Sequence, residues 1–189
     1  MTAQPCASKE TMDPIAELIS QGSTREAAAM AAREHGAAVG RLCMAMLGSQ
    51  AEAEEASQEA LIAAYRSMSS YRGEGSFKAW LMGIARKICA RRIETRVRRE
   101  NKLRLVYDAD SAEPSQKLPD DVVQKRHDAQ RVRVALEQLR PSEREAILLR
   151  YGSGLSYREV GEACGIQEAA ARKRASRGLE SLRRVLSGE

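Results

Sequence analysis

The chain has 189 residues, of which 43% are hydrophobic and only 4% aromatic, and its formal net charge is +5 at pH 7. Ala and Leu dominate the apolar residues and β-branched runs are scarce, which favours packed helices over a sheet. No stretch approaches the ~20 apolar residues of a membrane span, and no secretory signal pattern stands at the start. These features exclude a helical membrane protein. We therefore expect an all-α, cytoplasmic protein without membrane insertion, with one medium or two small domains.

The cysteines stand alone in the sequence, without any CxxC pair, and there are only two histidines. Zinc-ligand spacing is therefore absent, and we expect neither a metal nor a cofactor. Isolated cysteines in apolar helical settings are usually small buried hydrophobes of a reducing compartment. The positions concerned are Cys6, Cys43, Cys89 and Cys164.

Apolar periodicity predicts a helical first half after a polar, flexible stretch at 1–12. A short helix ends at Gly22, and longer helices follow at about 23–47, 52–68 and 77–99. Tyr65 belongs to the predicted buried face of the third helix. Trp80 lies on the apolar stripe of the fourth, so we expect it in the core rather than as a base-stacking platform. The roles of Tyr71 and Phe77, beside a glycine-rich loop at 69–76, stay open.

The fourth helix has a broad basic surface, since cations far outnumber acids between 66 and 104. Such a surface neutralises phosphates and makes nucleic-acid binding sensitive to salt; a solvated helix end is the plainer alternative. The candidate DNA-binding residues here are Arg86, Lys87, Arg91, Arg92, Arg96, Arg98 and Arg99.

An acidic, proline-containing stretch at 105–122 predicts a linker, because this composition cannot bury much surface. The linker divides the chain into domains at 13–104 and 123–189. The second block opens with a helix near 120–138, on whose apolar stripe Val132 lies, and Pro141 stops it. Ser142 and Glu145 match a capping box, so we predict that a new helix starts there.

The segment at 155–166 has a helix-turn-helix layout. Ser156 and Glu159 form a capping box for its first helix. Gly161 permits a close helix approach, and Gly165 supplies the turn with a positive φ. A second helix at about 167–186 follows, with a buried face formed by Ala171, Ala175, Leu179, Leu182 and Leu186.

The opposite face of that last helix is basic and fits the DNA major groove, with its first residues nearest the base edges. Gln167 and Glu168 are expected nearest the bases. Arg172 and Lys173 contact bases or phosphates in this hypothesis. An ordinary helical hairpin with a solvated basic face is the alternative. The candidate residues are Gln167, Glu168, Ala169, Arg172, Lys173, Arg174 and Arg177, of which the last two would hold the backbone.

The order of these signals resembles the extracytoplasmic-function (ECF) sigma factors of bacterial RNA polymerase. Residues 51–60 are similar to the acidic helix of that family. The segment Tyr71-Arg72-Gly73-Glu74-Gly75-Ser76-Phe77-Lys78-Ala79-Trp80-Leu81, followed by Ile84-Ala85-Arg86, resembles F-R-G-x-x-S-F-x-x-W-L-x-x-I-A-R. Leu139-Arg140-Pro141 with Arg144 resembles L-P-x-x-x-R. Leu149-Arg150-Tyr151 with residues 154–160 resembles L-R-Y…G-L-S-Y-x-E-I. The match covers nearly the whole chain in the family's order.

The resemblance implies a fold of two helical domains and a set of partners. Core RNA polymerase would bind through its large-subunit clamp to Glu54, Glu55, Gln58 and Glu59. The basic helix at 84–99 and the loop before it would recognise and open the minus-ten element of promoter DNA. The helix-turn-helix would read the minus-thirty-five element, and an anti-sigma factor would hold the protein inactive. No residue is catalytic, so the protein is not expected to be an enzyme.

Some positions depart from the family pattern. Ala56 and Ser57 replace larger apolar residues, and Lys87 stands where many members have Asn. Residues 169–171 are all alanine where G-T-V is usual, which removes a hydroxyl at the start of the recognition helix. The promoter preference is therefore left open by the sequence.

Two other functions are compatible with parts of this sequence. A stand-alone helix-turn-helix regulator would bind an operator as a dimer, with half-sites about one helical turn apart. It would leave the acidic helix and the first basic block without a role. A helical interaction protein would instead dock its basic faces on an acidic partner.

Overall fold

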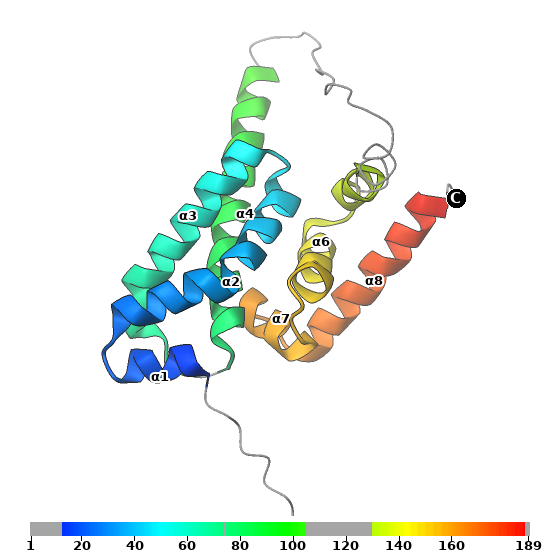
Figure 1. The fold of residues 1–189 in the computed structure, drawn as a ribbon. Helices are drawn as coiled ribbons and strands as arrows, with labels where there is room; N and C mark the ends of the chain where they lie inside the picture. Colours follow the sequence, from blue (N-terminus) through cyan, green and yellow to red (C-terminus); the bar gives the residue numbers. More distant parts are fainter. Residues whose placement is uncertain (1–12, 74, 105–129, 188–189) are drawn as a thin grey trace, which may run out of the picture.

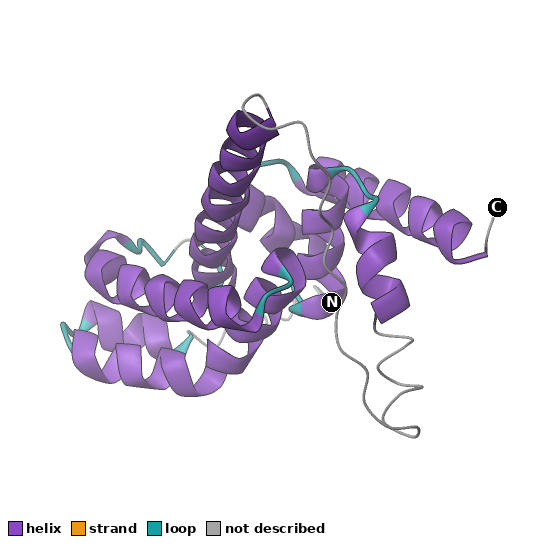
Figure 2. Ribbon diagram, turned by 90° about the horizontal axis from the view of Figure 1, so that it is seen from above, coloured by secondary structure: helices purple, strands orange, loops and turns teal. Residues whose placement is uncertain are grey.

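The structure is a computed structural model that describes residues 13–73, 75–104 and 130–187. All regular structure in these residues is helical, as Figure 2 shows. The expected flexible N-terminus at 1–12 and the expected linker at 105–122 lie outside the described residues. The all-helical fold class predicted from composition and periodicity is confirmed for the described part of the chain.

The first half consists of α1 (Pro14–Ser20), α2 (Thr24–Leu47), α3 (Gln50–Ser67), the 3-10 turn η1 (Met68–Ser70) and α4 (Phe77–Arg104). α2, α3 and α4 pack against one another (Figure 1). The buried stripe of α3 consists of alanines at steps of three and four, none more than 4% exposed: Ala53, Ala56, Ala60 and Ala64. Small side chains at this spacing let the neighbouring helices approach closely. Tyr65, predicted on this face, is 44% exposed, so that prediction was wrong: the buried face contains only the small residues.

The second half contains a helix at 130–137, α6 (Pro141–Ile147), a π-helical turn η2 (Leu148–Gly152), α7 (Tyr157–Cys164) and α8 (Glu168–Ser187). α6 begins with Pro141 at its first position and Arg140 as its N-cap, without a side-chain cap. The capping box predicted at Ser142 is therefore wrong, because proline starts the helix earlier. Val132 and Leu186, both predicted to be buried, are 42% and 37% exposed.

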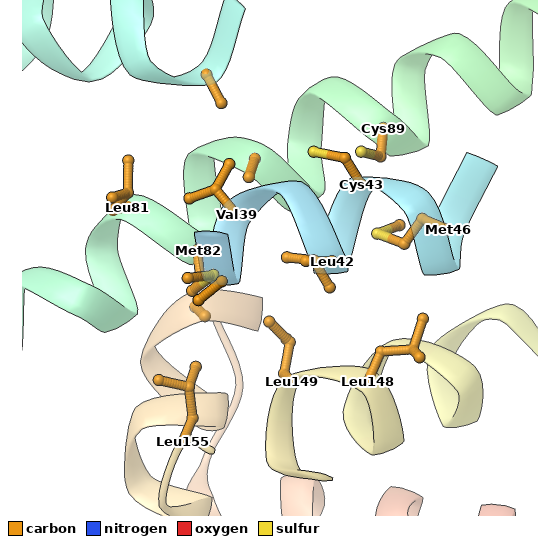
Figure 3. Packing of buried hydrophobic residues seen from close by; sticks show 14 of the residues in the cluster. Val39, Leu42, Cys43, Met46, Leu81, Met82, Cys89, Leu148, Leu149 and Leu155 are labelled. Atoms are coloured by element: carbon orange, nitrogen blue, oxygen red, sulfur yellow. The ribbon is translucent and has the colours of Figure 1, made fainter. Parts of the chain in front are cut away.

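The two halves share one apolar core. Leu148 and Leu149 of η2 point toward Leu42 and Met46 of α2, with Met82 of α4 beside them (Figure 3). Each of these side chains is at most 6% exposed. Removing such side chains from water stabilises a fold by about 1.5–3 kcal/mol each. The domains therefore form a packed pair rather than independent units.

Candidate nucleic-acid interface

The helix-turn-helix predicted from sequence is present in α7 and α8. The Ser156 hydroxyl accepts from the Glu159 amide at 3.2 Å, and the Glu159 carboxylate accepts from the Ser156 amide at 2.7 Å. Gly165 ends α7 with a φ of +67°. A Cβ on Gly161 would lie 2.7 Å from the carbonyl oxygen of Ile166, so only glycine fits where the turn folds back.

α8 separates an apolar face from a basic one. Its buried residues are Ala171, Ala175, Gly178 and Leu182. Among the predicted DNA-binding residues, Arg174 is half-buried and the others are exposed: Gln167, Glu168, Ala169, Arg172, Lys173 and Arg177. Apart from Arg174, the predicted side chains are therefore open to solvent on α8 and at the residue before it.

The candidate DNA-binding residues of α4 form two groups: some are exposed, and the others contact neighbouring parts of the protein. Lys87, Arg91, Arg98 and Arg99 are exposed along the helix. These four residues are the exposed α4 cations, and their contact with DNA phosphates stays a prediction. The remaining candidates, Arg86, Arg92 and Arg96, are engaged in contacts within the protein.

Arg92 and Arg96 link α4 to the acidic start of α3. The Arg92 guanidinium lies 2.8 Å from the Glu59 carboxylate and 3.1 Å from that of Glu55, and Arg96 lies 3.3 Å from Glu52. The hydrogen bond to Glu59 is the largest influence that raises the pKa of Arg92. Two sets of residues predicted for different partners, cations for DNA and acids for polymerase, thus meet at one helix–helix contact.

Arg86 lies between the two halves of the molecule. Its guanidinium lies 3.1 Å from the Glu145 carboxylate, and both side chains are only 16% exposed. Its Nε donates to the carbonyl oxygen of Ala163 at 3.3 Å. One turn earlier on α4, a Cβ on Gly83 would lie 3.2 Å from that same oxygen. In this arrangement the guanidinium of Arg86 is therefore engaged by Glu145 and the Ala163 carbonyl oxygen.

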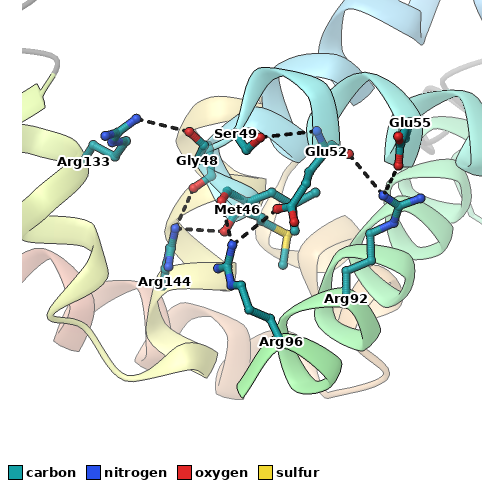
Figure 4. A network of polar contacts seen from close by, with 11 residues as sticks. Met46, Gly48, Ser49, Glu52, Glu55, Arg92, Arg96, Arg133 and Arg144 are labelled. Atoms are coloured by element: carbon teal, nitrogen blue, oxygen red, sulfur yellow. Dashed lines mark hydrogen bonds and ion pairs between the residues drawn. The ribbon is translucent and has the colours of Figure 1, made fainter. Parts of the chain in front are cut away.

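Arginines also surround the C-terminal end of α2, a feature that sequence reasoning missed. Arg144 donates to the carbonyl oxygens of Ala45 and Met46 at 2.7 and 3.1 Å, and Arg133 donates to that of Gly48 at 3.3 Å (Figure 4). Cations stabilise the negative end of a helix. Burial lowers the pKa of Arg144. Both arginines come from the second half of the chain, so this cluster joins the domains. No local pattern could have revealed it, because the partners are backbone atoms about 85–99 residues away.

The acidic face of α3 is exposed. Glu54, Glu55, Gln58 and Glu59, predicted for polymerase binding, all reach solvent. Ile62, at 51% exposure, and Tyr65 continue the same helix as exposed apolar residues. A mixed acidic and apolar surface of this kind suits a protein partner better than a polyanion.

The aromatic residues near the glycine-rich loop form a packed group. The ring centroids of Phe77 and Trp80 are 5.3 Å apart, and each lies 5.4 Å from that of Tyr71. Phe77 is fully buried and Trp80 is partly buried. The Tyr71 hydroxyl donates to the carbonyl oxygen of Gly75 at 2.9 Å. The group supports the loop from inside, and Phe77 is not available for base stacking.

Cys43 and Cys89 are buried in the core, where they contact each other, and Cys164 is half-buried. The hydrogen bond that the Cys89 thiol donates to Cys43, together with burial, raises the pKa of Cys89. Within the described ranges, no cluster of His, Cys, Asp and Glu could hold a metal ion. In the same part of the chain, no helix is long and apolar enough to cross a membrane.

The chain matches two family models in the order of its domains. Sigma-70 region 2 matches residues 31–100, and Sigma-70 region 4 matches residues 129–182. The first range contains most of α4 with its candidate DNA-binding residues, and the second contains α7 and most of α8.

Characterised relatives agree with these matches. The RNA polymerase sigma factor CarQ of Myxococcus xanthus is 34% identical over 149 residues, covering 75% of this chain and 78% of the relative. The ECF sigma factor SigW of Bacillus subtilis is 31% identical over 157 residues, covering 77% and 81%. SigE of Mycolicibacterium smegmatis is also 31% identical, over 82% of this chain, but the match spans only 60% of that longer protein.

Solved structures share the fold. CnrH in complex with the cytosolic domain of CnrY matches with a TM-score of 0.70 and 19% identity, over 94% of this chain and 99% of that one. The sigma factor RpoE of Bartonella quintana, in complex with the anti-sigma factor NepR, matches with a TM-score of 0.65 and 24% identity, over 84% and 95%. On the strength of both family models and these relatives, the chain belongs to the ECF family of RNA polymerase sigma factors.

Proposed function

We propose that this chain binds core RNA polymerase and directs it to promoters through two separate DNA-binding surfaces. The domain at 13–104 would bind polymerase and the minus-ten element, and the domain at 123–189 would bind the minus-thirty-five element, with 105–122 as the linker. The observation that carries the proposal is the exposed acidic face of α3, which lies apart from the basic face of α8. A stand-alone regulator has no need of such a face.

The predicted site residues would have different partners, according to where they lie in the structure. Glu54, Glu55, Gln58 and Glu59 would contact the polymerase clamp, and Arg92 would hold two of these carboxylates in place. The exposed α4 cations would contact DNA phosphates near the minus-ten element. Arg86 would reach DNA only after the two halves separate, because Glu145 and the Ala163 carbonyl hold it in the closed arrangement.

The proposal includes an inhibitory protein partner. RpoE, which shares this fold, was solved with the anti-sigma factor NepR. A partner that covers the α3 face would keep polymerase from its binding surface. A partner that stabilises the packed pair of domains, here called the closed arrangement, would keep DNA from Arg86. The chain would act in the cytoplasm, where the polymerase is, and it would supply no catalytic residue because polymerase performs the chemistry.

The direct test is binding and transcription with purified core polymerase. The wild-type chain is expected to form a stable complex and to initiate at specific templates of a promoter library. Glu54→Lys, which breaks no ion pair of the described residues, should weaken the complex without changing the circular dichroism spectrum. Glu34→Lys makes the same charge change on an exposed position of α2 and should leave affinity unchanged. Specific duplex binding without any polymerase binding would instead support the stand-alone regulator.

A further inference from the structure

Arg172, on the first turns of the recognition helix, is held from two sides. Its guanidinium donates to the Glu168 carboxylate at 2.8 Å, and its Cζ lies 4.9 Å from the centroid of the Tyr157 ring. The side chain is nevertheless 63% exposed. Within the described residues, neither Lys173 nor Arg177 has an acidic side chain within ion-pair distance. Arg172 thus combines a restrained position with donor groups that face solvent.

The Tyr157 ring is itself fixed by the body of the domain. Tyr157 is the first residue of α7, directly after the N-cap Ser156. Its hydroxyl lies 3.3 Å from that of Tyr151, and the guanidinium of Arg150 lies 5.0 Å from its ring centroid. Arg150 in turn donates to the carbonyl oxygen of Leu155 at 3.0 Å. A chain of contacts therefore runs from the loop before α7, through the ring, to Arg172.

The side chains of Arg172 and Glu168 have the donors and acceptors that suit a guanine–cytosine base pair. An arginine fork donates to O6 and N7 of guanine in the major groove, while a carboxylate accepts from N4 of cytosine. The side chain at the fifth position of α8 points back toward the helix N-terminus, which is the end that meets base edges in a helix-turn-helix. An arginine that is already restrained loses less conformational freedom on binding.

We propose that Tyr157 and Glu168 are positioning residues that hold Arg172 for direct recognition of a guanine in the upstream promoter element. The inference rests on the proposed function for its target, since it assumes that α8 contacts that element. Beyond that function, the inference names guanine as the base, Arg172 as the residue that contacts it, and Tyr157 and Glu168 as residues that act through Arg172. Tyr157 needs no contact with DNA in this role.

The test uses holoenzyme, formed from core polymerase and the full chain, on templates randomised across the upstream element. Wild type is expected to prefer guanine at one position, and Arg172→Lys should lower that preference at least about tenfold because the fork is lost. Tyr157→Leu should lower it by about three- to fivefold, the worth of an exposed cation–π contact. Tyr157→Phe keeps the ring and should retain the preference. Glu168→Gln should lower it too.

Controls separate positioning from folding. Arg158→Lys alters a comparable exposed pair on α7, with Glu162 at 3.1 Å, and should leave the preference unchanged. Preference at the minus-ten element, scored in the same transcripts, should be the same in all variants. A misfolded variant would lose both preferences, and its thermal unfolding midpoint would show it.

Several results would overturn the inference. Equal loss in Tyr157→Leu and Tyr157→Phe would assign the effect to the hydroxyl rather than the ring. A guanine preference that survives Arg172→Ala would mean that another residue contacts the base. If wild-type holoenzyme initiates nowhere, the polymerase assignment fails separately. Selection from bare randomised duplexes would then decide whether the ring-dependent guanine preference exists.

Discussion

Position 161 requires glycine because two backbone segments cross there. A Cβ would lie 2.7 Å from the Ile166 carbonyl oxygen and 3.3 Å from the Glu168 amide nitrogen. Gly161→Ala is therefore expected to lower the free energy of unfolding by about 1–3 kcal/mol through strain, as measured by urea denaturation. Gly40→Ala is the matched control, because nothing lies within 4 Å of a Cβ in that helix. Gly40→Ala should raise the free energy of unfolding by up to about 1 kcal/mol. Equal effects at both sites would contradict the claim that two backbone segments meet too closely at Gly161 for a Cβ.

His35 makes stability depend on pH. Burial lowers the pKa of its imidazole below the ordinary 6.5, against the opposing charges of Glu34 and Asp13. Below pH 6.5 the unfolded chain therefore binds a proton more readily than the folded one, so folding loses stability as pH falls from 6.5 toward the folded-state pKa. His35→Gln should flatten this part of the curve of unfolding free energy against pH. An unchanged slope between wild type and variant would refute the assignment.

At the scale of elements, local signals predicted the helices and the turn, but not which charged groups are engaged. The Ser156 capping box, Gly161 and Gly165 lie within a few residues of their partners, so the helix-turn-helix could be recognised from sequence. Arg92 and Arg91 are neighbours with the same chemistry, yet only the first meets the acids of α3. That difference depends on where α3 crosses α4, which periodicity does not specify.

The pairing of α3 with α4 gives a prediction of its own. Arg92→Ala should lower the free energy of unfolding by up to about 1 kcal/mol, because its acidic partners are half exposed or more and such pairs are weak. The loss should shrink at 1 M salt, where the screening length is about 3 Å. Arg91→Ala, at an exposed neighbouring position, should have little effect. A loss in Arg92→Ala that is independent of salt would indicate packing rather than charge.

At the scale of the whole molecule, the closed arrangement conflicts with the proposed use of α4. Its apolar contacts, the Arg86–Glu145 pair and the arginines at the end of α2 join the domains. A polar linker allows packed or separate domains, so the sequence does not determine which of the two occurs. The surfaces that join them are built from residues far apart in the chain. Closed packing would thus compete with binding to polymerase and promoter DNA, because that binding would use the separated domains.

Gly83 offers a way to shift that equilibrium without touching a charged group. It is buried on α4, and a Cβ there would lie 3.2 Å from the Ala163 carbonyl oxygen and 3.4 Å from its Cα. Gly83→Leu should therefore wedge α7 away from α4. Small-angle X-ray scattering should show a larger radius of gyration, while helix content by circular dichroism stays the same. Association with core polymerase should become faster, because a larger fraction of the chain is already open.

Gly36→Leu is the control for the wedge, since a Cβ at that position of α2 meets nothing within 4 Å. It should change neither the radius of gyration nor the association rate. If Gly83→Leu expands the chain but leaves the association rate at the wild-type value, separation is not what limits polymerase binding. If it leaves the radius of gyration unchanged, the contact between Gly83 and Ala163 does not hold the domains together. The first of these results would remove the closed arrangement as a barrier to polymerase binding.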